Sequence, residues 1–198
     1  MEEPEEFFLR KIRLSWEVAN PHKRLQHMAV RYLLLELQPD FPMEAIILSP
    51  SQKPLLADGS RYFSFSHSRD FAAAITGAWP VGIDVEAVDD KVRKVAGRFL
   101  NAEELQAVPG QGRLEYLTLC WCAKEALYKW AGQAGLSFRE DMDLSPFQPA
   151  AAGLIRACVQ YKGCTASLQL HYLLETTSAR QAYALVWVQS PLPEAWLH

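Results

Sequence analysis

The sequence contains, just past its middle, Trp121-Cys122-Ala123-Lys124-Glu125-Ala126-Leu127-Tyr128-Lys129, which predicts the centre of a long helix beginning near Arg113 and ending at Gly132. Trp121, Glu125 and Lys129 are four residues apart, so they share one side of that helix. A column of an aromatic ring, a carboxylate and an ammonium group suits a metal-bound anion. It also suits a solvated ion pair beside a core tryptophan, because Glu and Lys pairs at this spacing are common on helix surfaces.

A second acidic motif lies upstream, in Gly82-Ile83-Asp84-Val85-Glu86. Asp84 and Glu86 are two residues apart on an expected strand, so both carboxylates point to one face. Neighbouring like charges repel, and a cation between them is one solution; a hydrated strand end is the other. If the long helix packs on this sheet, Glu125 joins them. Three carboxylates suit a hard divalent cation, and Mg²⁺ is the best candidate because it combines carboxylate, water and phosphate oxygens.

Basic and hydroxyl groups occur in two earlier segments. Asn20-Pro21 is a good helix start, and the helix expected over residues 22–37 carries Arg24 and Arg31 on nearly the same side. That side is either a solvated basic face or a phosphate-binding one. Ser66-His67-Ser68 ends an alternating strand over residues 62–68 and is either a structural hydrogen-bonding group or an anion site. Lys53, Lys124 and Lys129 would add positive charge, so transfer of a phosphate-linked group is the implied chemistry.

The order of elements predicts an α+β fold. Strands are expected over residues 45–48, 62–68, 71–79, 81–85, 157–161, 167–175 and 182–188, with helices over 22–37, 89–100 and 113–132. A short helix after Asn101 holds Glu104, where a capping box explains the glutamate without any chemistry. Because strands follow one another without alternating helices, the sheets should be mainly antiparallel. We expect two α+β halves, residues 1–88 and 89–198.

Composition limits the class of protein. A chain of 198 residues with 49% hydrophobic residues can bury a sizeable core, and its net charge of −3 argues against binding nucleic acid through bulk positive charge. The four cysteines do not form a zinc pattern. The acidic start does not resemble a secretory leader, and no run of apolar residues is long enough to span a membrane. These features predict a cytoplasmic protein with free thiols.

The ordered set of motifs resembles the 4′-phosphopantetheinyl transferases, in particular their larger pseudo-dimeric class, which activates surfactin synthetase and similar enzymes. The segments that carry the resemblance are Gln52-Lys53-Pro54, Ser66-His67-Ser68, Gly82-Ile83-Asp84-Val85-Glu86, the segment 98–104 that ends in Glu103-Glu104, and Trp121 to Lys129. The match covers roughly residues 20 to 140, with order and spacing intact. It implies that the two halves are similar and pack as an intramolecular pseudo-dimer, each sheet on a long helix, and we expect a monomer.

The resemblance also implies the reaction and the role of each residue. The phosphopantetheine arm of coenzyme A would move to a serine of an acyl or peptidyl carrier protein, releasing adenosine 3′,5′-bisphosphate. Asp84, Glu86 and Glu125 would hold Mg²⁺, with Glu125, Lys129 and Glu104 as catalytic residues. The residues implied to bind the coenzyme are Arg24, Arg31, Lys53, Pro54, Ser66, His67, Asp84, Lys124 and Lys129.

One position departs from the family pattern. Gln52 replaces the glycine that opens Gly-Lys-Pro, which puts a side chain where the backbone would approach the coenzyme. The alternatives are a non-catalytic coenzyme A-binding or docking protein with the family fold, and an unrelated magnesium-dependent phosphohydrolase. Carrier proteins of this family are acidic near the modified serine. The basic helix over residues 89–100 is therefore either a docking surface or a solvated face.

Overall fold

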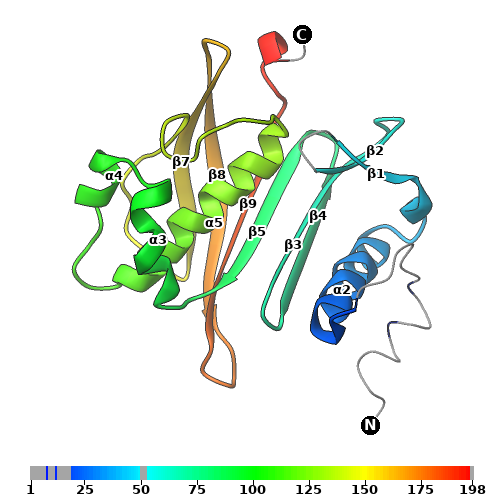
Figure 1. Cartoon of the computed structure of the whole chain (residues 1–198), viewed down its shortest axis with the longest axis horizontal. Helices are drawn as coiled ribbons and strands as arrows, with labels where there is room; N and C mark the ends of the chain where they lie inside the picture. Colours follow the sequence, from blue (N-terminus) through cyan, green and yellow to red (C-terminus); the bar gives the residue numbers. More distant parts are fainter. Residues whose placement is uncertain (1–7, 9–11, 13–18, 50–52, 197–198) are drawn as a thin grey trace.

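The fold has two long helices, each lying against antiparallel strands (Figure 1). The computed structural model describes residues 8, 12, 19–49 and 53–196. The elements before the central motif are α2 (Pro21–Leu37), η1 (Met43–Ala45), β1 (Ile46–Leu48), β2 (Pro54–Leu56), β3 (Tyr62–Ser68), β4 (Phe71–Gly77) and β5 (Val81–Ala87). The later elements are α3 (Lys91–Phe99), α4 (Ala102–Gln106), α5 (Arg113–Ala131), β6 (Met142–Leu144), β7 (Ala152–Tyr161), β8 (Cys164–Thr176), β9 (Ala182–Gln189) and η2 (Glu194–Trp196).

Every strand pairing in the described residues is antiparallel, which confirms the predicted α+β class. Two hairpins, β1-β2 and β3-β4, form two-stranded sheets. The remaining strands form a five-stranded sheet in the order β5-β9-β8-β7-β6. Strand β5, which we expected in the first half, is thus hydrogen-bonded into the sheet of the second half. The boundary at residue 88 stays a prediction.

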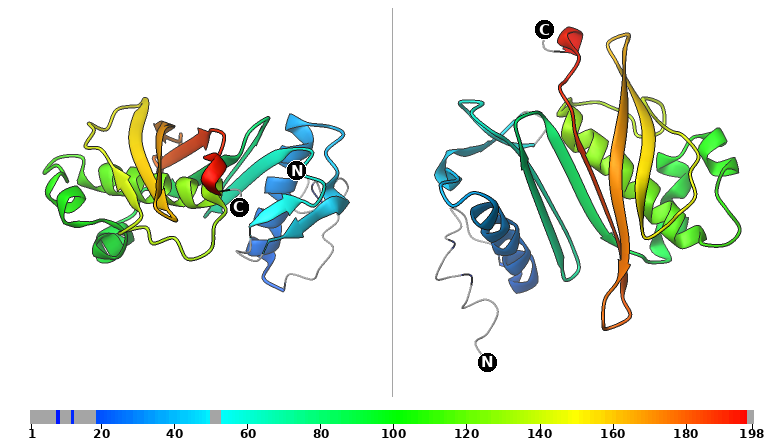
Figure 2. Two further views of the ribbon diagram at one scale, coloured as in Figure 1. Left: turned by 90° about the horizontal axis from the view of Figure 1, so that it is seen from above. Right: turned by 180° about the vertical axis from the view of Figure 1, so that it is seen from behind.

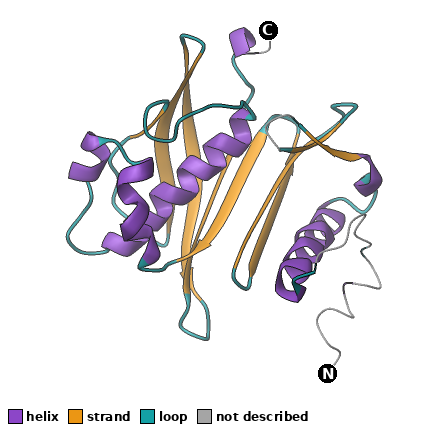
Figure 3. Cartoon of the chain, in the orientation of Figure 1, coloured by secondary structure: helices purple, strands orange, loops and turns teal. Residues whose placement is uncertain are grey.

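The two long helices begin and end where local sequence requires it. Asn20 caps α2 by accepting a hydrogen bond from the backbone N–H of Lys23 at 3.0 Å, with Pro21 at the first helical position. Helix α5 ends at Gly132, whose φ of 64° lies in the left-handed region that glycine adopts without strain. Helix α2 lies on the β3-β4 hairpin and α5 on β5 and β9 (Figure 3).

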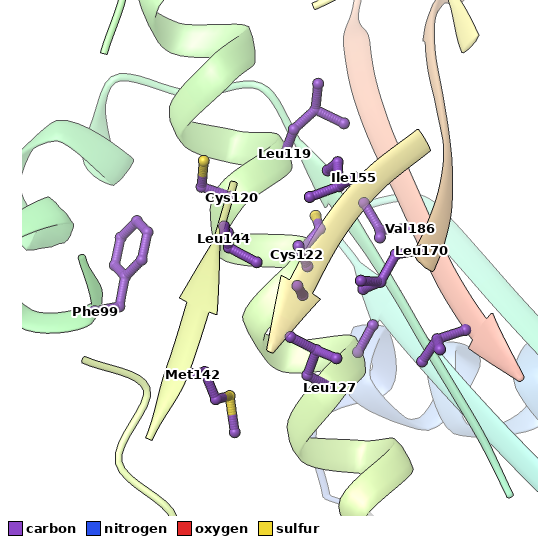
Figure 4. Close-up of a cluster of buried hydrophobic side chains, with 14 of the residues drawn as sticks. Phe99, Leu119, Cys120, Cys122, Leu127, Met142, Leu144, Ile155, Leu170 and Val186 are labelled. Atoms are coloured by element: carbon purple, nitrogen blue, oxygen red, sulfur yellow. The ribbon is translucent and has the colours of Figure 1, made fainter. Parts of the chain in front are cut away.

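The main core fills the space between α5 and the five-stranded sheet. Alternate residues of β7, β8 and β9 point toward the helix, as Ile155, Leu170 and Val186 do in Figure 4, and each of these three side chains is fully buried. Leu127 and Cys122 of α5 meet them from the other side. Seen from behind, β7 and β8 stand in front of α5, so this helix covers one face of the sheet (Figure 2).

Strands β3 and β5 lie side by side but belong to different sheets. Serine side chains bridge them. The N–H of Ile83 donates to Ser64 Oγ at 3.3 Å, Ser66 Oγ donates to Asp84 Oδ1 at 2.6 Å, and the Ser68 hydroxyl donates to Glu86. Three alternate residues of β3 thus bond to β5, one to its backbone and two to its acidic side chains.

Two short strands were absent from the sequence-based prediction. Residues 54–56 form β2, and residues 142–144 form β6, the edge of the larger sheet. None of the helices in the described residues is long and apolar enough to span a membrane.

Candidate active site

A cavity of about 480 Å³ opens where β3, β5 and α5 meet. Most of the residues singled out from the sequence line it: Lys53, Pro54, Ser66, His67, Asp84, Glu86, Glu125 and Lys129. Aromatic side chains that the sequence did not single out, Phe63, Phe65 and Tyr128, complete the wall. Segments more than 70 residues apart in the sequence therefore contribute to one cavity.

Gly82 brings the acidic strand against the central helix. A Cβ atom at this position would lie 1.9 Å from the carbonyl oxygen of Ala126 and 2.7 Å from the backbone nitrogen of Trp130. Only a residue without a side chain allows β5 and α5 to approach this closely. The contact places Asp84 and Glu86, two and four residues after Gly82, beside the helix side that carries Glu125.

Asp84 is buried, with 3% of its surface exposed. Its Oδ1 accepts hydrogen bonds from Lys129 Nζ at 2.7 Å and from Ser66 Oγ at 2.6 Å. Its Oδ2 is also buried, and no described group donates a hydrogen bond to it. A buried carboxylate oxygen without a donor is costly, so this atom is suited to an electropositive ligand.

Glu86 and Glu125 sit in environments that disfavour their charged forms. Burial raises the pKa of Glu86, opposed by the hydrogen bond from Ser68, while the nearby charge of Asp84 raises it further. Burial, and then the charge of Asp84, raises the pKa of Glu125 to about 7. Within the part of the chain that the structure describes, no three acidic, histidine or cysteine side chains are gathered tightly enough to chelate a metal. The three carboxylates line one cavity, where their like charges repel one another.

Cationic groups line the same cavity. Lys129 Nζ also donates to the carbonyl oxygen of Ile83 at 3.0 Å, so this ammonium group is held at the strand edge. Burial lowers the pKa of Lys53 to about 8, and its Nζ lies 3.4 Å from the carbonyl oxygen of Trp130. Burial also lowers the pKa of His67. A polyanion entering the cavity would stabilise the charged forms of these groups.

The two arginines of α2 are outside the lining of this cavity. Arg31 is largely buried, donates to the carbonyl oxygen of His27 at 3.0 Å, and lies over the ring of Phe65 at 5.7 Å. Since Phe65 lines the cavity, Arg31 forms a layer behind it. Arg24 is half-buried on the same helix. The structure brings α2 to the cavity through His27, whose ring packs edge-on against His67 with centroids 5.4 Å apart.

Glu104 and Lys124, which the sequence also singled out, are outside the cavity lining. Lys124 is completely buried, and Glu104 is 5% exposed. Their charged atoms are paired at 2.6 Å inside the core of the second half. Lys124 lies on a different side of α5 from Glu125 and Lys129, because successive residues of a helix point about 100° apart. Neither side chain lines the cavity, so the coenzyme contact of Lys124 and the catalytic role of Glu104 stay predictions that the cavity lining does not support.

Trp121 has a role that the spacing alone did not reveal. Its ring packs against Phe99 and Phe138, with centroid distances of 5.1 and 5.7 Å, so it is partly a core residue. Its side chain also forms a hydrogen bond with Glu86 that lowers the pKa of this carboxyl group. Ser68 and Trp121 thus hold Glu86 from two sides. Ser68 was not among the predicted site residues. Its position two residues after Ser66, on the same face of the strand, could have indicated that it also faces β5. Gln52, the departure from the family pattern, lies outside the described residues.

Comparisons with known proteins agree with these observations. Residues 80–188 match the family model described as the 4′-phosphopantetheinyl transferase superfamily. The 4′-phosphopantetheinyl transferase psf-1 of Bacillus pumilus is 32% identical over 120 residues, which are 58% of this chain and 51% of that protein.

A crystal structure of Thermotoga maritima holo-[acyl-carrier-protein] synthase is 27% identical, with a TM-score of 0.40, over 56% of this chain and 63% of the synthase. The chain therefore spans about half to two thirds of the length of these proteins. The family match covers more than half of the 198 residues and includes β5 and α5, which carry all three carboxylates. The chain belongs to the 4′-phosphopantetheinyl transferase superfamily.

Proposed function

We propose that this protein transfers the 4′-phosphopantetheine group of coenzyme A to a serine hydroxyl of an acyl or peptidyl carrier protein. The observation that carries the proposal is the meeting of Asp84, Glu86 and Glu125 with Lys53, His67 and Lys129 in one cavity. Carboxylates for a divalent cation and cationic groups for phosphates are the two requirements of a pyrophosphate-cleaving transfer. Family membership and the similarity to the Bacillus pumilus transferase support the same reaction.

The donor set fits a hard divalent cation. Asp84 Oδ2 is a buried oxygen to which no described group donates, and the charges of Asp84 and Glu86 both raise the pKa of Glu125. Asp84, Glu86 and Glu125 would hold the cation, with Mg²⁺ as the proposed metal. When bound, it neutralises negative charge that develops on the pyrophosphate. Lys129 Nζ donates to Asp84 Oδ1, so this ammonium group lies beside the proposed cation site and within the cavity that would receive the phosphates.

Each of the chain's own residues around the cavity has a proposed role that follows from its position. Lys53, His67 and Lys129 bind the phosphates of the coenzyme, and Pro54 and Ser66 shape the wall between them. Arg31 supports Phe65 from behind, and Arg24 adds positive charge on the same helix. These groups orient the donor so that the acceptor serine meets the phosphorus bonded to the pantetheine oxygen.

Glu125 is the group suited to accept the proton of the acceptor serine. Its carboxyl group lines the cavity on the same side of α5 as Lys129, where the acceptor serine has to approach the donor phosphate. The serine oxygen forms a bond to phosphorus, the bond to the bridging pyrophosphate oxygen breaks, and adenosine 3′,5′-bisphosphate leaves. Lys129, beside Asp84 and four residues from Glu125, stabilises the charge on the phosphate under attack.

We also propose that the two halves are related as an intramolecular pseudo-dimer and that the chain acts as a monomer. In each half a long helix precedes antiparallel strands and packs on them: α2 on the β3-β4 hairpin, and α5 on the larger sheet. The cavity is lined by β3 and by residues 53 and 54 on one side, and by β5 and α5 on the other. A molar mass of one chain in light scattering would support the monomer, and a stable dimer would contradict it.

The decisive assay mixes the protein with coenzyme A, Mg²⁺ and an apo carrier protein and measures the mass of the carrier. A gain equal to one phosphopantetheine group is expected, and it should disappear when a chelator removes the metal. If several carrier types gain no mass where a known transferase modifies them, the proposed activity is wrong. Tight coenzyme binding in that case would indicate the non-catalytic alternative.

The low pKa of Lys53 predicts how coenzyme binding depends on pH. Burial lowers the pKa to about 8, so the ammonium form is lost as the pH rises through that value. Bound phosphate favours the charged ammonium form and so raises the pKa of Lys53 in the complex. The affinity for coenzyme A should therefore be constant below pH 8. Above pH 8 it should fall about tenfold per pH unit, until the pH reaches the raised pKa of the complex. Calorimetry with coenzyme A between pH 7 and 10 measures the effect. In Lys53→Gln the decline above pH 8 should be absent; an equal decline in both proteins would contradict the role of Lys53.

The basic side of α3 is the proposed docking surface for the carrier. Its members, all exposed, are Lys91, Arg93, Lys94 and Arg98. Reversing Lys94 and Arg98 to glutamate should raise the KM for an acidic carrier about tenfold, because like charges then face each other. The Kd for coenzyme A should stay unchanged, since neither residue lines the cavity. Reversal of Arg139 and Arg156, which are exposed elsewhere, is the matched control. Equal losses in both double variants would contradict specific docking.

A further inference from the structure

Lys124 and Glu104 match the family motifs, yet the cavity uses neither of them. Lys124 Nζ donates three hydrogen bonds: to Glu104 Oε2 at 2.6 Å, to the carbonyl oxygen of Phe138 at 2.8 Å, and to that of Met142 at 2.9 Å. An ammonium group has three protons, so its donor capacity is fully used. The three acceptors belong to α4, to the segment after α5, and to β6.

Both carboxylate oxygens of Glu104 also accept hydrogen bonds within this network. Its Oε2 also accepts from the backbone N–H of Asn101 at 2.8 Å, and its Oε1 accepts from the N–H of Leu144 at 2.8 Å. Asn101 in turn donates through its side chain to Asp143 at 2.8 Å. The carboxylate therefore ties the start of α4 to β6 and leaves no oxygen directed at the cavity. A proton acceptor for the carrier serine needs such an oxygen.

The position of Lys124 along α5 connects this network to the active site. Successive residues of a helix are 100° apart, so a fixed direction for residue 124 sets the directions of residues 125 and 129. The contact of Gly82 with Ala126 sets how close α5 lies to β5. It does not by itself prevent rotation of the helix about its axis. The anchored side chain of Lys124, on another side of the helix, supplies that second constraint.

We propose that Lys124 and Glu104 form a positioning pair, which fixes the rotation of α5 so that Glu125 and Lys129 face the cavity. The pair acts through these two residues and touches no substrate. The inference rests on the proposed transferase function. In this role Glu104 does not accept the proton of the carrier serine. The adjacency of Lys124 and Glu125 is explained as well, because anchoring residue 124 sets the direction of residue 125.

The test is a cycle of Glu104→Gln, Lys124→Met and the double variant, assayed for carrier modification at 10 °C. Each single change leaves one buried charge without its partner, whereas the double variant removes both charges. We expect each single variant to lose at least tenfold in kcat per folded molecule, with a smaller change in KM for coenzyme A, because Lys53 and His67 are not on α5. The double variant, which removes the anchor altogether, should regain stability relative to the single variants but keep the loss of kcat per folded molecule.

Leu119→Ala provides the matched control. Leu119 is a completely buried residue of the same helix that takes part in none of the hydrogen bonds of the pair, so its truncation lowers stability without removing those bonds. Its kcat per folded molecule should match the wild type. Circular dichroism at the assay temperature gives the folded fraction of each variant.

Two results would overturn the inference. If Glu104→Gln abolishes turnover while Lys124→Met keeps full kcat per folded molecule, then Glu104 acts in the chemistry itself. If the single variants keep full kcat per folded molecule and differ only in melting temperature, then the pair is merely structural. Failure of the proposed function is distinguishable from both, because the wild-type protein would then modify no carrier while the melting temperatures of the cycle still differ.

Discussion

Glu125→Gln is expected to lower carrier modification about a thousandfold and, at the same time, to make the ligand-free protein more stable at pH 8. The rate falls because the variant loses both a carboxylate for the divalent cation and the proposed proton acceptor. The stability rises because the wild-type structure holds a half-buried carboxyl group whose pKa is raised from 4.5 to about 7, first by desolvation and then by the charge of Asp84. A neutral amide of the same shape removes that conflict.

The pH dependence of this stability change has a definite sign. A raised pKa in the folded state means that folding favours the protonated form, so the cost of ionisation is absent below pH 4.5 and develops fully above pH 7. A difference of two to three pKa units corresponds to roughly 3 kcal/mol at pH 8. The gain in melting temperature for Glu125→Gln should therefore be several degrees at pH 8 and vanish near pH 4.

Thermal unfolding without metal, together with the mass assay, checks both parts. Glu103→Gln is the matched control, since Glu103 is exposed on α4 and should change neither property. A variant that keeps more than a tenth of the wild-type rate would contradict the catalytic assignment of Glu125. A variant less stable than the wild type at pH 8 would contradict the described environment of its carboxyl group.

Gly82→Ala should strongly destabilise the protein and abolish its activity. The added methyl group would lie 1.9 Å from a carbonyl oxygen and 2.7 Å from a backbone nitrogen of α5, and neither atom can move without the helix. Overpacking against backbone in a core costs about 3 kcal/mol or more. Whatever protein still folds should have β5 displaced from α5, with Asp84 and Glu86 no longer beside Glu125, and turnover should be lost.

Gly97→Ala supplies the comparison. Gly97 lies inside α3 with open space around its missing side chain, so alanine there should be neutral or stabilise by up to about 1 kcal/mol through helix propensity. Urea unfolding of both variants measures the difference. Equal stability of Gly82→Ala and the wild type would mean that β5 and α5 do not approach as closely as the structure describes.

The sequence predicted those parts of the molecule that depend on local pattern. The helix over 113–132 and the alternation that points Asp84 and Glu86 to one face both follow from residues close in the chain, and α5 and the cavity lining agree with them. The resemblance to the family supplied most of the residues that line the cavity. Its wider claim of a pseudo-dimer stays a prediction.

The features that the sequence did not predict depend on contacts between distant segments. The pairing of β5 with β9 joins residues about a hundred positions apart, and no local pattern specifies the partner of an edge strand. Lys124 next to Glu125 suggested a shared site, whereas packing directs the two side chains to different surroundings. A buried lysine fully satisfied by one glutamate and two carbonyl groups cannot be distinguished in sequence from an exposed one.

The pairing of β5 with the last strand also has a consequence for synthesis of the protein in the cell. All the side chains proposed to bind the metal and the phosphates leave the ribosome before residue 130, but the neighbour that aligns their strand is made only after residue 181. A nascent or truncated product that ends before that point carries every reactive group without an ordered site. The activity should therefore appear only after the residues of β9 have been made and have left the ribosome.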